Sequence, residues 1–390
     1  MLFRQLFDAA SSTYTYLLAD AATHDAVLID SVFEQHARDA ALVRELGLTL
    51  RYVLDTHCHA DHVTGAWRMR GAFGCQIGLS PLYGATHVDL PLTHGTVIRF
   101  GTEALEVRAT PGHTDGCVAL VSADHRVVFT GDTLLVRGAG RTDFQHGSAR
   151  RLFHSIREQL FSLPDACALY PAHDYLGRTA STIGEERRYN PRIGGGAREE
   201  DFVGYMHNLG LPHPKQMAVA VPANLRSGEP ADGRAPTAPD WGPVAVTYAG
   251  QPEIAPEWVA AHRSEIHVLD VRDANEFDGE LGHIPNAQLV PLGDLRARVT
   301  EFVASDVAGK RSALFASDVA GKRSALFASD VAGKRSALFA SEAPTDRPIV
   351  VVCQTGKRSA LATQLLTAAG VTRIANLAGG MVAWRELGLN

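Results

Sequence analysis

The sequence has few cysteines, few aromatic residues and no long hydrophobic run. Its five cysteines are spread over 390 residues, and an odd number in so long a chain does not indicate a disulfide framework. No apolar stretch approaches the ~18 residues of a membrane span, and the first residues lack the pattern of a signal peptide. The net charge of −6 argues against nucleic acids and anionic membranes as partners. We therefore expect a cytoplasmic protein that binds no nucleic acid and no membrane.

The composition is that of a globular protein, and the chain is long enough for two or three domains. Residues 1–220 alternate short β-branched runs with amphipathic stretches, which predicts a layered α/β domain. Prolines 222, 230, 236, 239 and 243 then interrupt the pattern, as is typical of a linker. We expect one domain at 1–225, a linker at 226–250 and a second domain at 251–390.

The predicted elements follow from hydrophobic periodicity. In the first domain, strands are expected at 14–20, 26–31, 50–57, 76–80, 96–100, 105–110, 117–122 and 126–132, with helices at 36–46 and 149–161. In the second domain, strands are expected at 266–272, 348–353 and 373–377, with helices at 256–265 and 359–370. The alternation of strand and helix in the second domain predicts a small parallel sheet.

Histidines and aspartates gather in one short segment that follows a predicted strand. His57, His59, Asp61 and His62 lie within six residues, and this crowding of polar groups brings no apolar packing. Imidazole and carboxylate are common metal ligands, so the segment predicts a metal site. Three further candidates each follow an apolar run and would lie at the end of a strand: His113, Asp132 and His173.

These motifs together resemble the metallo-β-lactamase superfamily, which implies an αββα sandwich with the metal between the sheets. Glyoxalase II, a two-metal thioester hydrolase of the glutathione system, uses all seven positions. Persulfide dioxygenases keep the same positions and hold one Fe(II) per chain. RGAGRTDFQ at 137–145 resembles the dioxygenase signature, and the chain lacks the helical glutathione-binding extension of glyoxalase II. We favour the dioxygenase and keep a glyoxalase-II-like binuclear zinc hydrolase as the alternative.

The dioxygenase resemblance implies roles for these residues. The iron ligands would be His57, His113 and Asp132, a set that leaves positions open for persulfide sulfur and O₂. The remaining four would orient the ligands and substrate: His59, Asp61, His62 and His173. Arg141 would lie near the iron and Tyr175 would line the glutathione pocket. The alternative for Arg141 is a structural salt bridge to Asp143, and the alternative for Tyr175 is ordinary packing.

One cysteine has a context that the other four lack. Cys353 ends the apolar run PIVVVC and opens a loop before a predicted helix. The loop residues are Gln354, Thr355, Gly356, Lys357, Arg358 and Ser359. Backbone N–H groups at a helix N-terminus, together with two basic side chains, favour a thiolate or a persulfide. Cys353 is therefore predicted to be nucleophilic, with an inert buried cysteine and a loop phosphatase as the alternatives.

The surroundings of this loop resemble a rhodanese. Residues 269–292 and 377–388 match the framing motifs of that family, and the loop between them has the form C-x-x-G-x-R-S. The short loop suits a sulfane sulfur better than a bulkier phosphate. Asp270 and Arg272 would lie beside the loop and support it.

A perfect tandem repeat interrupts the second domain. SDVAGKRSALFA occurs three times at 305–340, and a period of 12 suits no common solenoid. Each copy resembles residues 356–361 but carries an aspartate at the position that corresponds to Cys353. We therefore expect an inserted surface duplication rather than a basic binding arm.

The two resemblances together imply a bifunctional enzyme of sulfur metabolism. The first domain would convert glutathione persulfide, O₂ and water into sulfite and glutathione. The second would transfer sulfane sulfur between glutathione persulfide, sulfite and thiosulfate through Cys353. A possible homodimer is implied by the resemblance alone. In a non-enzymatic alternative the second domain is a sulfur-sensing or docking module, and Cys353→Ser would leave sulfur-transfer rates unchanged.

Overall fold

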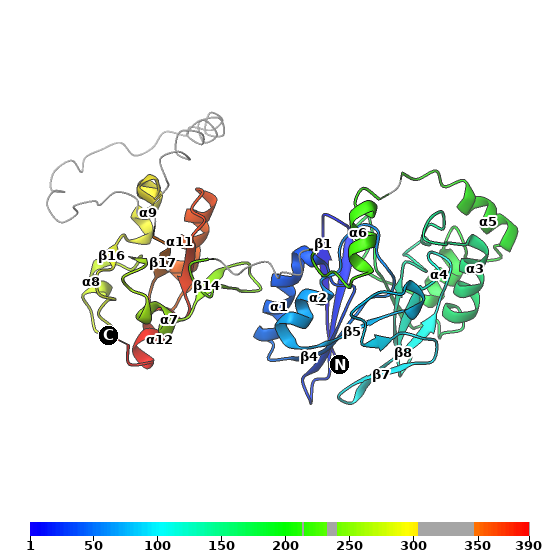
Figure 1. Cartoon of the computed structure of the whole chain (residues 1–390), viewed down its shortest axis with the longest axis horizontal. Helices are drawn as coiled ribbons and strands as arrows, with labels where there is room; N and C mark the ends of the chain where they lie inside the picture. Colours follow the sequence, from blue (N-terminus) through cyan, green and yellow to red (C-terminus); the bar gives the residue numbers. More distant parts are fainter. Residues whose placement is uncertain (213, 232–239, 303–346, 390) are drawn as a thin grey trace. The chain divides into compact units, whose positions relative to one another are not determined.

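The computed structural model describes residues 1–212, 214–231, 240–302 and 347–389 (Figure 1). The chain divides into two compact units, Met1–Pro236 and Thr237–Asn390. The tandem repeats at 305–340 lie outside the described residues. Within the described ranges, no helix has both the length and the apolar character that crossing a bilayer requires.

The first unit contains two six-stranded sheets. One sheet has the order β1-β2-β3-β4-β5-β6, with bounds Leu2–Asp8, Thr13–Ala19, Asp25–Ile29, Thr49–Leu54, Gln76–Leu79 and Leu90–Pro91. The other sheet has the order β12-β11-β10-β9-β8-β7. From β7 to β12, its strands span Val97–Phe100, Glu103–Ala109, Val118–Ser122, Val127–Gly131, Ala168–Pro171 and Ser181–Thr182.

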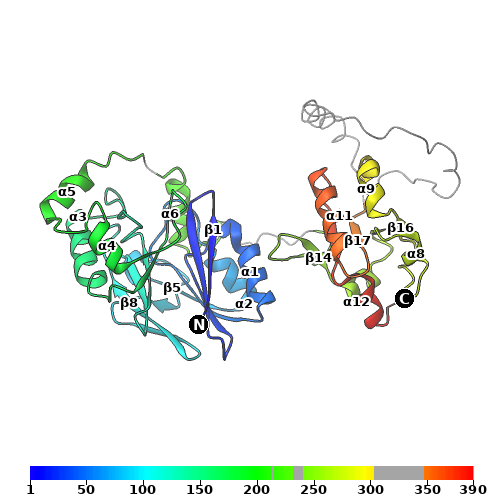
Figure 2. The same ribbon diagram turned by 180° about the vertical axis from the view of Figure 1, so that it is seen from behind.

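The two sheets pack face to face, and helices cover their outer faces (Figures 1 and 2). The inner core joins Tyr16 of β2 to Phe129 of β10, whose ring centroids are 4.9 Å apart. The helices are α1 (His36–Glu45), α2 (Ala66–Phe73), α3 (Ala149–His154), η3 (Ser155–Leu160), α4 (Ile183–Tyr189), α5 (Glu199–His207) and α6 (Met217–Asn224), with short turns η1 (Phe33–Gln35) and η2 (Pro81–Tyr83). This is the predicted αββα sandwich.

Burial on both faces explains the composition of the central strands. Every residue of β2 and β9 is buried, because one face of each sheet meets the opposite sheet and the other meets helices. Strands in such a position are nearly continuous hydrophobic runs rather than alternating ones. This is why VALVS and its neighbours were recognisable as strands from sequence.

The chain beyond α6 continues to pack against the first unit. The carbonyl of Ser227 accepts a hydrogen bond from the Trp67 N–H at 3.0 Å, and the Ser227 hydroxyl donates to the carbonyl of Thr86 at 2.6 Å. Ser227 is buried. Residues 226–228, which the composition placed in the linker, therefore contribute to the structure of this unit.

The described residues of the second unit form one sheet in the order β13-β14-β18-β17-β15-β16. In chain order the strands span Ala245–Val246, Pro252–Ile254, His267–Asp270, Gln288–Leu289, Ile349–Val352 and Ile374–Leu377, and only β13 runs antiparallel to its neighbour. The helices are α7 (Pro256–Ala261), α8 (Ala274–Phe277), α9 (Leu292–Arg298), η4 (Val299–Phe302), α11 (Lys357–Ala368) and α12 (Gly380–Glu386). Side chains of α9 and α11 pack on one face and those of α7 and α12 on the other, which gives the predicted α/β domain.

Candidate active sites

The ends of four strands bring all seven predicted metal-site residues together. The segment 57–62 follows β4, and single residues follow β8, β10 and β11. Two groups form, and within each group one possible ligand atom per residue lies within 4.8 Å of the others. The first group is His57, His113 and Asp132, and the second is His59, Asp61, His62 and His173.

The first group directs three ligand atoms toward one another. Nε2 of His57 lies 3.9 Å from Oδ2 of Asp132, and Nε2 of His113 lies 3.7 Å from the same oxygen. Nδ1 of His113 donates to the carbonyl of Arg141 at 2.6 Å, which leaves the Nε2 lone pair available. Nδ1 of His57 lies 3.0 Å from the Thr56 hydroxyl. That hydroxyl donates its one hydrogen to a carboxylate, so it accepts a hydrogen bond from Nδ1–H of His57. His57 therefore also presents an unprotonated Nε2.

The carboxylate behind His57 belongs to Asp30, a residue that the sequence reasoning missed. Asp30 lies directly after β3 and is buried. Its Oδ1 accepts from the Thr56 N–H at 2.7 Å and lies 3.2 Å from Nε2 of His59. Asp30 thus orients two histidines of the metal segment from behind. The available signal was an aspartate at the end of the apolar run AVLI, the same signal that identified Asp132.

The second group is linked by hydrogen bonds. Oδ2 of Asp61 lies 2.8 Å from Nδ1 of His62 and 3.0 Å from Nε2 of His173. Nδ1 of His173 lies 2.7 Å from Oδ1 of Asp132, so this histidine bridges two carboxylates. Burial alone would lower the pKa of His173, but Asp132 and Asp61 raise it well above its usual value.

The side chains of the site have the chemical properties that metal ligands require. Among the described residues, Nδ1 of His59 and Nε2 of His62 are buried and have no hydrogen-bond partner. Burial lowers the pKa of His57 and His59, which keeps both imidazoles neutral, the form that binds metal. Burial would raise the pKa of Asp132, but His173 and the other histidines hold it below its usual value and keep it ionised. The first group therefore offers ligands in the protonation state that a metal requires. In the second group, the raised pKa of His173 keeps its imidazole protonated between Asp61 and Asp132, so it serves those carboxylates first.

Arg141 and Tyr175 lie near the cluster in different ways. The Arg141 guanidinium makes two hydrogen bonds to Asp143, at 2.7 and 2.6 Å, and donates to the carbonyls of residues 211 and 212. Its backbone carbonyl, rather than its charge, contacts the cluster through His113. Tyr175 is 69% exposed, and its ring lies parallel to that of His173, with centroids 6.3 Å apart.

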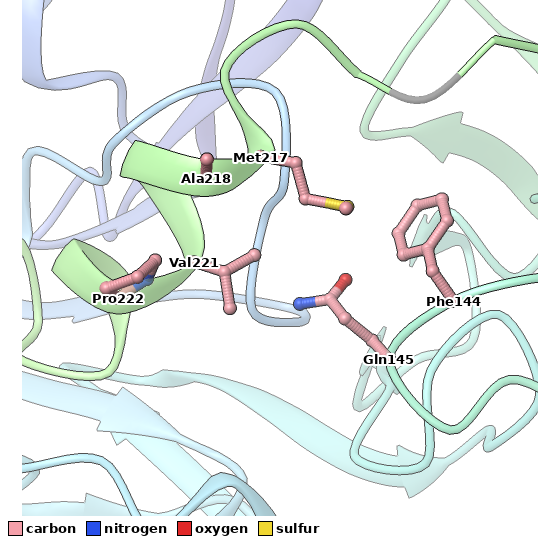
Figure 3. Close-up of a pocket in the computed structure, with 6 residues that line it drawn as sticks. All are labelled: Phe144, Gln145, Met217, Ala218, Val221 and Pro222. Atoms are coloured by element: carbon pink, nitrogen blue, oxygen red, sulfur yellow. The ribbon is translucent and has the colours of Figure 1, made fainter.

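An apolar pocket lies beside the cluster (Figure 3). The ring of Phe144 meets that of His113 edge-on, with centroids 5.8 Å apart. The pocket has a volume of about 280 Å³ and is lined by Phe144, Gln145, Met217, Ala218, Val221 and Pro222. Helix α6 forms one wall, so a segment that the composition treated as the start of a linker contributes to this site.

The loop of the second unit surrounds Cys353 with hydrogen-bond donors. Cys353 follows β17, and α11 begins at Lys357 after Gly356, whose φ is +88°. The Ser359 hydroxyl donates to Sγ at 3.2 Å. Burial alone would raise the pKa of the thiol, but the Ser359 hydroxyl and the N–H groups of Ser359, Thr355 and Arg358 lower it. The loop is built to hold a sulfur anion.

Supporting charges surround this loop. Arg272 and Asp270 are both buried, and the guanidinium donates to the carboxylate at 2.6 Å and to the carbonyl of Gly282 at 2.8 Å. Arg358 makes two hydrogen bonds to Glu276, at 2.6 and 2.5 Å, a partner that the sequence reasoning missed. Gln354 and Thr355 are exposed, as is Lys357. Arg358 is therefore fixed by an ion pair and stays partly exposed, whereas Lys357 is exposed.

Comparison with known proteins adds family relationships to this geometry. Residues 9–173 match the metallo-beta-lactamase superfamily, and residues 255–387 match the rhodanese-like domain. The chain is similar to the mitochondrial persulfide dioxygenase ETHE1 of Homo sapiens, with 54% identity over 229 residues, 58% of this chain and 89% of the human protein. It is also 33% identical to a probable metallo-hydrolase of Burkholderia pseudomallei, over 60% of this chain and 96% of that protein.

Solved structures give the same assignment for the first unit. The crystal structure of ETHE1 from Myxococcus xanthus matches with a TM-score of 0.57 and 50% identity, and the match covers 58% of this chain and all of that one. A metallo-beta-lactamase from Staphylococcus aureus has a TM-score of 0.55 over 97% of this chain and 98% of its own, but at 20% identity this likeness concerns the fold alone. The chain belongs to the persulfide dioxygenase family of the metallo-beta-lactamase superfamily, and it carries a rhodanese-like, sulfurtransferase-type domain after its dioxygenase domain.

Proposed function

We propose that the first unit oxidises glutathione persulfide with O₂ to sulfite and glutathione, using one Fe(II) held by His57, His113 and Asp132. The overall reaction consumes one persulfide, one O₂ and one water. The observation that carries this proposal is the hydrogen-bond geometry of the first group. Both histidines have Nδ1 engaged and Nε2 facing Oδ2 of the ionised carboxylate.

Two histidines and one carboxylate form the ligand set of non-haem Fe(II) oxygenases. When bound, Fe(II) would supply the redox chemistry that allows O₂ to react with a persulfide. The residues of the chain would hold the reactants in place. Thr56 and the Arg141 carbonyl fix the ring orientation of the two histidines, and the apolar pocket beside Phe144 would limit water near the reacting sulfur. Tyr175, at the exposed side of His173, would contact the glutathione part of the substrate.

For the second unit we propose sulfur transfer through Cys353. The thiolate would attack the outer sulfur of glutathione persulfide, break its S–S bond and release glutathione, leaving a persulfide on Cys353. Sulfite would then attack the outer sulfur of that persulfide, forming thiosulfate and restoring the thiolate. The donors around Sγ would stabilise the anion in both forms. The linker would keep the two active sites at high effective concentration with respect to each other, without fixing their geometry.

The decisive experiment measures O₂ uptake and sulfur products with the full chain loaded with Fe(II). With glutathione persulfide, we expect O₂ uptake and thiosulfate formation by the wild type. Cys353→Ser should keep the O₂ uptake and release sulfite instead of thiosulfate. Asp132→Asn should lose the O₂ uptake and keep sulfur transfer from glutathione persulfide to added sulfite. If iron-loaded wild type takes up no O₂, the dioxygenase proposal is wrong.

A specific observation favours a second candidate, the binuclear zinc thioester hydrolase. Nδ1 of His59 and Nε2 of His62 are buried and unpartnered among the described residues, so the second group could also hold a metal once His173 gives up its proton to solvent. That enzyme would bind two metals per chain and hydrolyse a glutathione thioester. Metal analysis after loading with Fe(II) or Zn(II) separates the candidates, because the dioxygenase requires one ion. A cytoplasmic location and a homodimer stay predictions.

A further inference from the structure

The metal-binding segment depends on other parts of the chain for its shape. Between β4 and α2, residues 55–65 form neither helix nor strand, apart from one isolated bridge at Thr64. Most of this segment is buried. Buried backbone N–H and C=O groups must find hydrogen-bond partners, and this segment has no helix or strand ladder of its own to supply them. Backbone groups of other segments supply some of these bonds, such as the Phe33 N–H that donates to the carbonyl of Val63 at 2.8 Å, and side chains supply others. The positions of the ligands therefore depend on both.

One side chain supplies three of these bonds. Nδ2 of Asn224 donates to the carbonyls of His59 and His62, both at 2.9 Å. Oδ1 of Asn224 accepts from the N–H of Thr64 at 2.8 Å. Both amide hydrogens and the amide oxygen are thus used on this one segment, and the residue is 3% exposed. Asn224 is the last residue of α6, and more than 150 positions separate it from its partners.

The chain after α6 is fitted closely to the same segment. Gly228 has φ +80°, and a Cβ atom there would lie 2.2 Å from the carbonyl oxygen of Thr64. Ser227 is hydrogen-bonded to Trp67 in the helix that follows the metal segment. Residues 224–228 therefore form a fixed support rather than a loose contact, and Asn224 is the member whose side chain reaches the backbone of metal-site residues.

We propose that Asn224 is a positioning residue of the metal site. It touches no ligand atom, and it acts by fixing the carbonyls of His59 and His62. Those carbonyls belong to the backbone that carries His57, one of the three proposed ligands, and the neighbouring residues that orient the ligand set, so fixing them fixes how His57 faces the metal. The proposal relies on the metal site of the proposed function but not on its reaction, because its test measures metal binding.

The test compares Asn224→Ala with a matched control, Asn190→Ala, in the full chain. Asn190 is also buried in the first unit, and its Nδ2 donates to the carbonyl of Gly138 at 3.0 Å and to Glu186 at 2.8 Å. Co(II) affinity is measured by competition with a chelator, and the visible absorption spectrum of the Co(II) protein reports the ligand geometry. Thermal unfolding of the metal-free proteins records the structural cost of each change.

We expect Asn224→Ala to weaken Co(II) binding by about 10–100-fold, the usual effect of removing a group that orients metal ligands, and to change the Co(II) spectrum. Asn190→Ala should lower the unfolding temperature and leave affinity and spectrum unchanged. If Asn224→Ala lowers only the unfolding temperature, Asn224 is merely structural and the proposal is wrong.

A second variant keeps the test decisive if Asn224→Ala does not fold. Asn224→Asp keeps the shape and the acceptor for Thr64 but loses both donated bonds to His59 and His62. Weakened Co(II) binding with an altered spectrum supports the proposal, and wild-type behaviour overturns it. Failure of the dioxygenase proposal would look different, because iron-loaded wild type would bind metal normally and take up no O₂.

Discussion

Replacing Ser359 by alanine tests how the second unit activates its thiol. Among the described residues, the Ser359 hydroxyl is the only side-chain group that donates a hydrogen bond to Sγ of Cys353, at 3.2 Å. Both groups are buried. Alanine removes this donor and leaves the N–H groups of Thr355, Arg358 and residue 359 itself in place. The substitution therefore separates one hydroxyl from the rest of the anion-binding loop.

The size of the effect follows from the charge on the acceptor. A hydrogen bond to an ionised group contributes about 1.5–3 kcal/mol, and one pKa unit corresponds to about 1.4 kcal/mol. Loss of the Ser359 hydroxyl should therefore raise the pKa of Cys353 by roughly one to two units. The thiolate is the reacting form, so the sulfur-transfer rate should fall by about 10–100-fold at a pH below both pKa values. Above both values, the two rates should converge.

The assay uses the ultraviolet absorbance of the thiolate as a function of pH. Burial raises the pKa of the other four cysteines, to about 12 for Cys58 and Cys117 and to about 11 for Cys75 and Cys167. Thiolate absorbance that develops below pH ~9 therefore belongs to Cys353. Subtracting the curve of Cys353→Ser removes the background.

Thr363→Val is the matched control for this experiment. Thr363 lies one turn further along α11, is buried, and donates to the carbonyl of Ser359 rather than to Sγ. Replacing Thr363 by valine should leave the pKa of Cys353 unchanged. If Ser359→Ala titrates at the same pH as the wild type, the hydroxyl does not stabilise the anion and the reasoning fails.

Three further predictions concern the scaffold around the two sites. Gly112→Ala should lower the free energy of unfolding of the first unit by about 3 kcal/mol in urea denaturation, because φ of Gly112 is +147° and a Cβ there would lie 2.3 Å from Cα of Leu152. Gly71→Ala is the control, since a Cβ at Gly71 would meet open space and should cost no stability. Asp132→Asn should abolish the rise in melting temperature that Co(II) gives the first unit, measured by calorimetry, because the remaining histidines lose their carboxylate. Arg358 holds the pKa of Glu276 at about 2, below its usual 4.5, so the pair stabilises the fold above pH 4.5 and loses its effect as the pH falls toward 2. The stability difference between wild type and Glu276→Gln, about 0.5–1 kcal/mol for this partly exposed pair, should shrink over that range in denaturant titrations.

Sequence reasoning identified the groups that carry chemistry because their types and positions are unusual. An imidazole or carboxylate directly after an apolar run is at the end of a buried strand, and this logic selected His113 and Asp132, which the structure places beside the metal segment. The same logic was not extended to Asp30. The strand β1 was also missed, because only two of its seven residues are buried and it lacks the apolar run of an inner strand.

Residues that act through long-range backbone contacts could not be found in this way. Asn224 lies in a proline-rich stretch, and Pro222 inside α6 is a strong local signal against a helix. Contacts between α6 and the metal segment stabilise the helix despite this proline. Nothing in the neighbouring sequence indicates that those contacts form. Glu276 is similar, since its partner Arg358 lies 82 positions away. Periodicity and motifs describe neighbours along the chain, whereas these two contacts depend on the completed fold.

The two units place their reactive groups at the ends of strands but control charge in opposite ways. In the first unit, burial keeps His57 and His59 neutral, and their ionised neighbour Asp132 supplies the negative charge that a cation requires. In the second unit, N–H groups and the Ser359 hydroxyl supply positive potential for an anion at Cys353. A chelator should therefore act on the first unit alone, and a thiol reagent that reaches the loop should act on the second. The two sites have no residue in common, so a variant can lose the activity of one unit and retain that of the other. The coupling between the two activities can therefore be measured by comparing such variants with the wild type.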